Sequence, residues 1–307
     1  MTAPDHGASA PQETTELSAA IGAYPRTRVL KEGSVPSSLL RLDFAEIPVI
    51  SRAFAPMVRE LRFDVSEMAI ATFLQARAAG RPLVLLPVVL ASRFQQSALI
   101  CPARSDIRGL ADLAGRRIGV RAYSQTTGMW LRGIIMEEGG PKPDAIRWIT
   151  FEDAHVQGIA DPPFAERAPK GADMMAMLKA GELDAVIVGN DMPDDPGLRP
   201  VFADPEAAAR AFFARHRIVP VNHMLCVTRR LADERPELVR EVVRMLRASA
   251  APVPPGPHGA PPDTRAALRP VIELALRYMT EQDMLPRPLT VDEVWDGLPP
   301  GIDQGIE

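Results

Sequence analysis

The stretch from Ser97 to Thr127, SALICPARSDIRGLADLAGRRIGVRAYSQTT, decides the fold. Its pattern predicts an apolar strand at 98–101, a short helix that ends at Gly115, and a second strand at 117–120. A tight turn follows and opens the next helix, and it carries three hydroxyl side chains, Ser124, Thr126 and Thr127. Hydroxyls and unpaired backbone N–H groups at the start of a helix can hold an anion. The stretch therefore predicts strand–helix alternation with an anion-binding turn.

Strand-like and helix-like segments alternate along the rest of the chain, which predicts an α/β fold with two mixed, mostly parallel sheets. Two crossing strands, near 97–103 and 220–228, would join the sheets and divide the chain into two lobes. We expect lobe I from residues 17–98 plus 226–307, lobe II from 102–222, and a disordered tail at 1–16. Ligands of open α/β sheets bind at the carboxyl ends of the strands, which would face each other across the cleft between the lobes.

Two segments of the predicted first lobe have distinct local patterns. Residues 63–65 read as a short buried strand, and Ser66 and Glu67 read as the start of a helix that Gly80 ends. The Pro/Gly-rich segment 252–262 cannot form regular structure.

Composition limits the class of protein. The chain has 307 residues, 46% apolar and 24% charged, with a net charge of −4. These values are typical of a globular protein and argue against a nucleic-acid partner, which would require a basic face. No apolar run reaches the ~18 residues of a membrane span, so no membrane contact is expected. The N-terminus lacks the pattern of a secretory signal, which favours a cytoplasmic location. Cys101 and Cys226 lie in apolar runs and are expected to be buried thiols.

The sequence lacks the established cofactor signatures. It contains no HExxH, no paired CxxC, no GxGxxG after a strand and no Walker loop. No cofactor is therefore predicted. A divalent metal would have to bind scattered side chains, with Glu152 and His155 as the candidates, and the sequence neither indicates nor excludes one. It leaves the oligomeric state open, a homo-oligomer included.

Several motifs together resemble one family. They are the runs at 24–27, 63–68 (FDVSEM), 146–148 and 220–223, and the spacing Tyr-x-x-Thr-x-x-x-Trp-x-Arg-Gly at 123–133. Over residues 20–295 the chain resembles the 4,5-dihydroxyphthalate decarboxylase family. The resemblance implies a type II periplasmic-binding-protein-like fold and a small aromatic carboxylate as the ligand. It also implies loss of carbon dioxide from a hydroxylated aromatic ring.

Such a reaction needs a proton at the ring carbon that loses its carboxylate, and His is suited to that transfer. His223 lies in an apolar strand, where it is either a core histidine or a proton donor in the cleft. His155 follows a strand, where it is either a supporting residue or an acid/base group. We take both as the catalytic candidates.

The remaining candidates would bind the substrate. Arg26 and Arg93 are the expected carboxylate ligands, because a guanidinium makes two parallel bonds to a carboxylate. Gln95 is another candidate. The others, each of which could instead be a helix cap or a core residue, are Ser66, Glu67, Tyr123, Ser124 and Thr126.

The sequence also allows a different class of function. Gln95-Gln96-Ser97 stands where the resemblance leads us to expect Arg-His-Ser. Amides bind polar ligands well but transfer protons poorly. The alternative is therefore a substrate-binding protein or sensor for an aromatic or other carboxylate, without chemistry.

Overall fold

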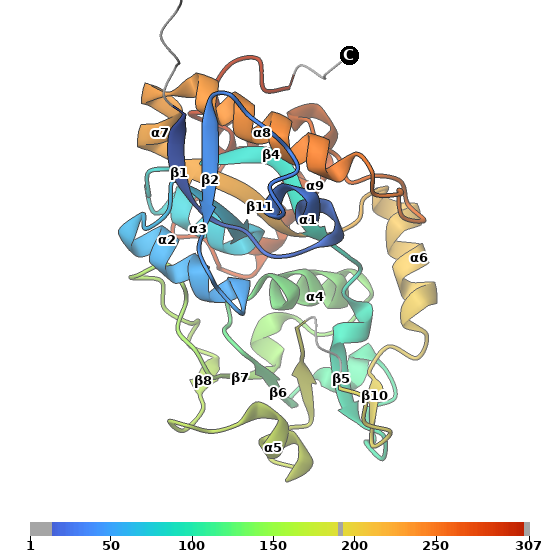
Figure 1. Ribbon diagram of the computed structural model, residues 1–307. Coiled ribbons are helices and arrows are strands. Elements are labelled where there is room, and N and C mark those ends of the chain that lie inside the picture. Colours follow the sequence, from blue (N-terminus) through green and yellow to red (C-terminus); the bar gives the residue numbers. More distant parts are fainter. Residues whose placement is uncertain (1–13, 190–192, 304–307) are drawn as a thin grey trace, which may run out of the picture.

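The computed structural model describes residues 14–189 and 193–303. The first of its two sheets occupies the upper half of Figure 1 and has the strand order β2-β1-β3-β11-β4. Its strands are β1 (Thr15–Ala20), β2 (Leu40–Phe44), β3 (Val65–Ala69), β4 (Leu83–Ser92) and β11 (Val221–Thr228). β1 pairs in parallel with β2 and β3, whereas β11 is antiparallel to both of its neighbours, β3 and β4.

The second sheet lies below the first and has the order β10-β5-β9-β6-β7-β8 (Figure 1). Its strands are β5 (Leu99–Pro102), β6 (Arg117–Val120), β7 (Arg147–Thr150), β8 (Ala165–Arg167), β9 (Ala185–Ile187) and β10 (Leu198–Pro200). Four of them, β9, β6, β7 and β8, run parallel, and β5 is antiparallel to both of its neighbours. The predicted α/β fold with two mixed sheets is confirmed. β5 and β11 each pair within a single sheet, so the connections between the sheets are residues 93–98 and 201–220 rather than the strands themselves.

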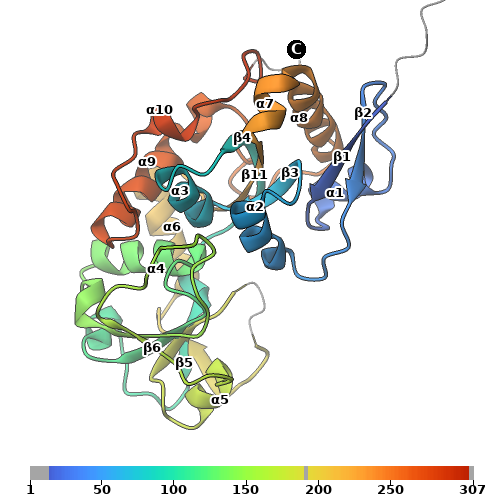
Figure 2. The same ribbon diagram turned by 90° about the vertical axis from the view of Figure 1, so that its left-hand side faces the viewer.

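Helices cover both faces of the first sheet. α1 (Pro25–Lys31), α7 (Arg229–Glu234) and α8 (Pro236–Ala250) share one core with alternate residues of β4, and α2 (Phe54–Glu60) and α3 (Ile70–Ala78) share the other core. This division follows from the alternation of side chains along a strand. The remaining helices are α4 (Thr126–Glu137), α5 (Met174–Lys179), α6 (Pro205–His216), α9 (Arg265–Glu281) and α10 (Val291–Val294). α4 lies between the two sheets in both views (Figures 1 and 2).

Close packing of α4 against α9 holds the second sheet near the first. A Cβ atom built on Gly133 of α4 would lie 2.1 Å from the ring of Tyr278 in α9. Only a glycine lets the two helices approach this closely. None of the helices in the described parts of the chain combines the length and the apolar character of a membrane span. Both cysteines are buried and free, as predicted.

Two local predictions were wrong, and two strands were missed. β3 continues to Ala69, so Ser66 and Glu67 lie in the middle of a strand rather than at a helix start. The strand is central and pairs with β1 and β11, and these ladders satisfy its backbone better than an early helix would. β1 begins at Thr15, inside the predicted tail, and residues 1–13 lie outside the described range. β8 and β10 were missed, because three residues are too few to show a period.

Candidate functional site

The two predicted histidines line one cavity of about 310 Å³, here called the histidine pocket. Residues from the first sheet, from α2 and α3, from the start of α4 and from the second sheet enclose it. The lining consists of Val49, Ile50, Ser51, Phe54, Ala69, Thr72, Arg93, Arg121, Gln125, Thr126, Thr127, His155, Met174, Ile187, Gly189, Asn222 and His223. Several of these residues follow the carboxyl ends of β3, β4, β6, β7 and β9, where α/β folds bind their ligands.

A buried carboxylate orients His223. Nδ1 of His223 lies 2.6 Å from Oε1 of Glu67, whose side chain is fully buried. The register explains the pair: Leu225 lies opposite Glu67, so His223 is its diagonal neighbour across the strands. Glu67 also accepts hydrogen bonds from the Tyr24 hydroxyl (2.6 Å) and the Gly22 amide (2.8 Å).

These contacts assign the roles of the atoms. With Glu67 ionised, both of its oxygens accept hydrogen bonds, so the His223 tautomer that satisfies this contact carries its proton on Nδ1 and leaves Nε2 for a ligand. Burial and then the negative charge of Glu67 raise the pKa of Tyr24 well above its usual value. Tyr24 therefore stays a neutral donor.

His155 has a different environment. Its Nδ1 lies 2.9 Å from Oγ1 of Thr72. Burial, and then the positive charges of Arg121 and Arg59, lower the pKa of His155 to about 4. Both histidine rings pack edge-on against Phe54, with ring centroids 5.7 Å (His155) and 5.2 Å (His223) from it. The pocket thus holds one histidine backed by a carboxylate and one that is neutral at pH 7.

Positive charge gathers on another part of the pocket. Arg93 donates a hydrogen bond to Oγ1 of Thr127 (3.2 Å), and Arg121 forms an ion pair with Glu152 (3.3 Å). Gln125, Thr126 and Thr127, at the start of the twelve-residue helix α4, line the same space. Two guanidinium groups and a helix N-terminus together favour an anionic ligand.

Other predicted site residues support the pocket or lie outside it. Gln95 does not line the pocket. Its buried amide donates hydrogen bonds to the Arg93 carbonyl (2.7 Å) and to Oδ1 of Asn222 (2.9 Å), and both of these residues line the pocket. Gln95 therefore positions two lining residues. Glu67 lies behind His223 rather than in the lining. Ser66 is buried and donates to the carbonyl oxygen of its neighbour Glu67.

Three further candidates are directed elsewhere. Tyr123 is buried between aromatic rings, with the guanidinium carbon of Arg132 3.9 Å from its ring centroid. Ser124 is also buried and lines none of the cavities described here. Arg26 donates to the Val89 carbonyl (3.1 Å) and lines a different cavity. Of the predicted substrate-binding residues, Arg93 and Thr126 lie in the histidine pocket.

The possible metal ligands do not converge. Glu152 faces Arg121, and His155 contacts Thr72. Within residues 14–189 and 193–303, no three His, Cys, Asp or Glu side chains come together as a metal site would need.

Sequence reasoning missed several residues that line the pocket or support it. Arg121 follows a predicted strand directly, which was a usable signal for a cleft position. Tyr24 lies within a motif already singled out, at 24–27. Thr72 lies inside α3 and carried no signal, because only the fold brings it next to His155.

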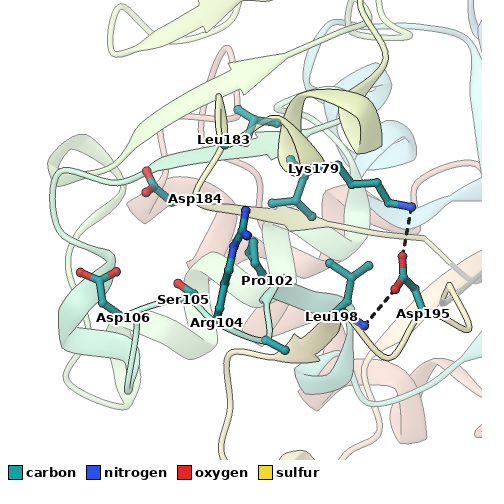
Figure 3. Close-up of a pocket in the computed structure, with 13 residues that line it drawn as sticks. Pro102, Arg104, Ser105, Asp106, Lys179, Leu183, Asp184, Asp195 and Leu198 are labelled. Carbon is teal, nitrogen blue, oxygen red and sulfur yellow. Dashed lines mark hydrogen bonds and ion pairs between the residues drawn. The ribbon is translucent and has the colours of Figure 1, made fainter.

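A larger cavity of about 690 Å³ lies at the far end of the second sheet, among β5, β10 and α5 (Figure 3). It contains no histidine, and an ion pair between Lys179 and Asp195 (3.0 Å) lies on one side of it. It offers no group suited to proton transfer near pH 7, so the histidine pocket is the better candidate for an active site.

Comparisons with known proteins show the family and the fold. The family described as NMT1/THI5 like matches residues 56–165. 4,5-Dihydroxyphthalate decarboxylase of Comamonas testosteroni is 31% identical over 261 residues, which cover 77% of this chain and 75% of that protein. The Pseudomonas putida protein of the same name is 29% identical and covers 64% of this chain and 81% of its own.

Solved structures share the fold at low identity. The alkanesulfonate-binding protein SsuA of Xanthomonas axonopodis pv. citri has a TM-score of 0.51 and 16% identity, covering 95% of this chain and 86% of its own. The desulfurization enzyme DSZB has a TM-score of 0.52 and 16% identity, and the match covers 92% of this chain and 97% of that enzyme. The chain is therefore a two-sheet α/β protein of the periplasmic-binding-protein-like class. Within that class it belongs to the 4,5-dihydroxyphthalate decarboxylase family.

Proposed function

We propose that the protein removes carbon dioxide from a hydroxylated aromatic carboxylate, 4,5-dihydroxyphthalate or a close relative, in the histidine pocket. The observation that supports this proposal is that His223, which Glu67 holds from behind, lines one pocket with Arg93 and Arg121. The volume of about 310 Å³ is at the lower end of the range for ligand sites, which suits a single ring. The relatives named as decarboxylases support the same reaction.

In the proposed mechanism His223 is the proton donor. Protonated His223, held by Glu67, gives its Nε2 proton to the ring carbon that carries the leaving carboxylate. The ring hydroxyl para to that carbon becomes strongly acidic as the ring takes up the proton. Neutral His155 can therefore accept the hydroxyl proton although its pKa is only about 4.

Loss of carbon dioxide completes the reaction. The bond between the ring and the carboxylate breaks, and its electron pair restores the aromatic ring. His155 then returns its proton to the ring oxygen, and solvent reprotonates His223. Arg93 and Arg121 would hold the carboxylates in position throughout.

The test is turnover in deuterium oxide with 4,5-dihydroxyphthalate and related hydroxybenzoates, followed by mass spectrometry. We expect a product that has lost carbon dioxide and carries one deuterium at the former carboxylate carbon. His223→Gln should lower kcat about 100-fold or more, whereas His258→Gln, an exposed histidine outside the pocket, should not change it.

The competing function is ligand binding without chemistry. Arg93, Arg121 and the start of α4 would bind an aromatic carboxylate equally well in a protein that only binds it. No loss of carbon dioxide from any compound, with saturable thermal stabilisation by one of them, would overturn the enzyme and support the binding protein.

A further inference from the structure

A second cavity, of about 360 Å³, lies on the face of the first sheet that α1 and α8 cover. We call it the accessory cavity. Its walls include Val88 and Leu90 of β4, Leu246 and Ala250 of α8, and Pro255 and Pro261 of the loop after α8. It shares no lining residue with the histidine pocket, which contains Phe54 and Thr72 from the opposite face. The two cavities are therefore separate spaces.

The charged residues of the accessory cavity do not balance. They are Arg26, Arg247 and Asp263. Arg247 engages Asp263 through its carboxylate (3.5 Å) and its carbonyl oxygen (2.7 Å). Arg26 donates to the Val89 carbonyl (3.1 Å), and no carboxylate in the described part of the chain forms an ion pair with it. One positive charge therefore remains uncompensated against apolar walls.

The environment of Arg26 makes that charge costly. Burial is the main influence on its guanidinium and lowers its pKa, although the negative charge of Asp263 acts in the opposite sense. A partly buried cation among apolar side chains is stabilised when an anion comes into contact with it. A planar carboxylate fits a guanidinium, and its single charge would bring the cavity to neutrality.

We propose that the accessory cavity binds a small monocarboxylate with an apolar body of about one ring, with its carboxylate on Arg26. The apolar walls select the body, and the single uncompensated cation selects one negative charge rather than two. The volume of about 360 Å³ admits a ligand of the same size class as the histidine pocket. The proposal does not depend on the decarboxylase reaction.

Methyl NMR on the full chain, with benzoate as the probe, shows at which residues the ligand binds. Benzoate should shift the methyl signals of Val88, Leu90 and Leu246 saturably. Neutral benzamide, which has the same shape, should bind at least about tenfold more weakly, because hydrogen bonds to charged groups are the stronger ones.

Substitutions then test the role of the charge. Arg26→Gln should weaken benzoate binding at least about tenfold. Arg28→Gln is the matched control, since Arg28 lies on the same helix, is exposed and pairs with Glu32, so the affinity should stay within about twofold. Ala250→Phe fills the cavity from α8 without changing Arg26, and should abolish the shifts.

Three results would overturn the proposal. Benzoate shifts confined to Val49 and Ile50 would place its binding in the histidine pocket. Equal effects of Arg26→Gln and Arg28→Gln would show general charge attraction, and no saturable shift at all would show that the cavity takes no such ligand. A thermal unfolding experiment shows whether Arg26→Gln is folded. If it is not, Ala250→Phe tests the proposal instead, and benzoate shifts that persist in Ala250→Phe would overturn it.

Discussion

Acid should destabilise the protein through His155, and replacing that residue should remove this part of the pH dependence. The pKa of His155 is about 4 in the folded protein, against about 6.5 in an unfolded chain. Between these two values the unfolded chain holds a proton at this residue and the folded protein does not. The free energy of unfolding therefore falls as the pH drops from about 6.5 to about 4.

The size of the effect follows from the shift. A pKa of about 4 instead of about 6.5 corresponds to about 3 kcal/mol in the free energy of unfolding. This contribution to stability is fully present above pH ~6.5 and is lost by pH ~4. Its physical source is the burial of the ring, together with Arg121 and Arg59, all of which oppose a positive charge there. His155→Gln keeps a polar partner for Thr72 but cannot take up the proton.

Urea unfolding between pH ~7.5 and ~4.5 measures this contribution. The free energy of unfolding of the unmodified protein, minus that of His155→Gln, should fall by about 2 kcal/mol over this range. Carboxylates that titrate in the same range are common to both proteins and cancel. His258→Gln, which replaces an exposed histidine in the same way, is the control variant. If the unmodified protein and His155→Gln lose the same amount of stability as the pH falls, burial does not lower the pKa of His155 and the prediction is refuted.

The remaining predictions concern the support of the site and the packing around it. Tyr24→Phe removes one of three hydrogen-bond donors to Glu67. We expect the free energy of unfolding, measured with urea, to fall by about 1 kcal/mol. We also expect kcat to fall while KM changes little. Gly133→Ala should cost about 3 kcal/mol or more in the same unfolding assay, because the new methyl group would overlap the buried ring of Tyr278; a cost below 1 kcal/mol would mean that the helices can separate freely. Arg121→Gln should weaken binding of an aromatic carboxylate about tenfold by calorimetry, and an unchanged affinity would exclude it as a ligand contact.

Long elements with a clear period were predictable from the sequence. The apolar spacing at about 126–138 predicts a helix, which the structure has at Thr126–Glu137. The spacing at 264–284 predicts another, which is Arg265–Glu281. Their apolar spacing extends over several turns, so the pattern rises above the effect of any single residue. The pattern Thr290-x-x-Glu293 predicts a capping box, and the two residues form one at the start of α10.

Site residues were harder to predict, because the sequence does not show toward which face of a sheet a side chain that follows a strand is directed. Arg26 and Tyr24 both follow β1, yet Arg26 lines the accessory cavity and Tyr24 reaches Glu67 beneath His223. Ser66 and Glu67 resembled a helix start because a polar pair after an apolar run usually ends a strand. Burial between two neighbouring strands overrode that local preference.

The sequence by itself determined the α/β alternation, the buried strands and the family motifs, because these depend on the order of residues within short windows. The tertiary structure decided which side chains meet. β11 inserts antiparallel between β3 and β4 and brings His223 to Glu67, 156 residues away, while the loop after β7 brings His155 to Thr72, 83 residues away. Such pairs depend on strand order and register across the sheet, and no local pattern encodes either of them.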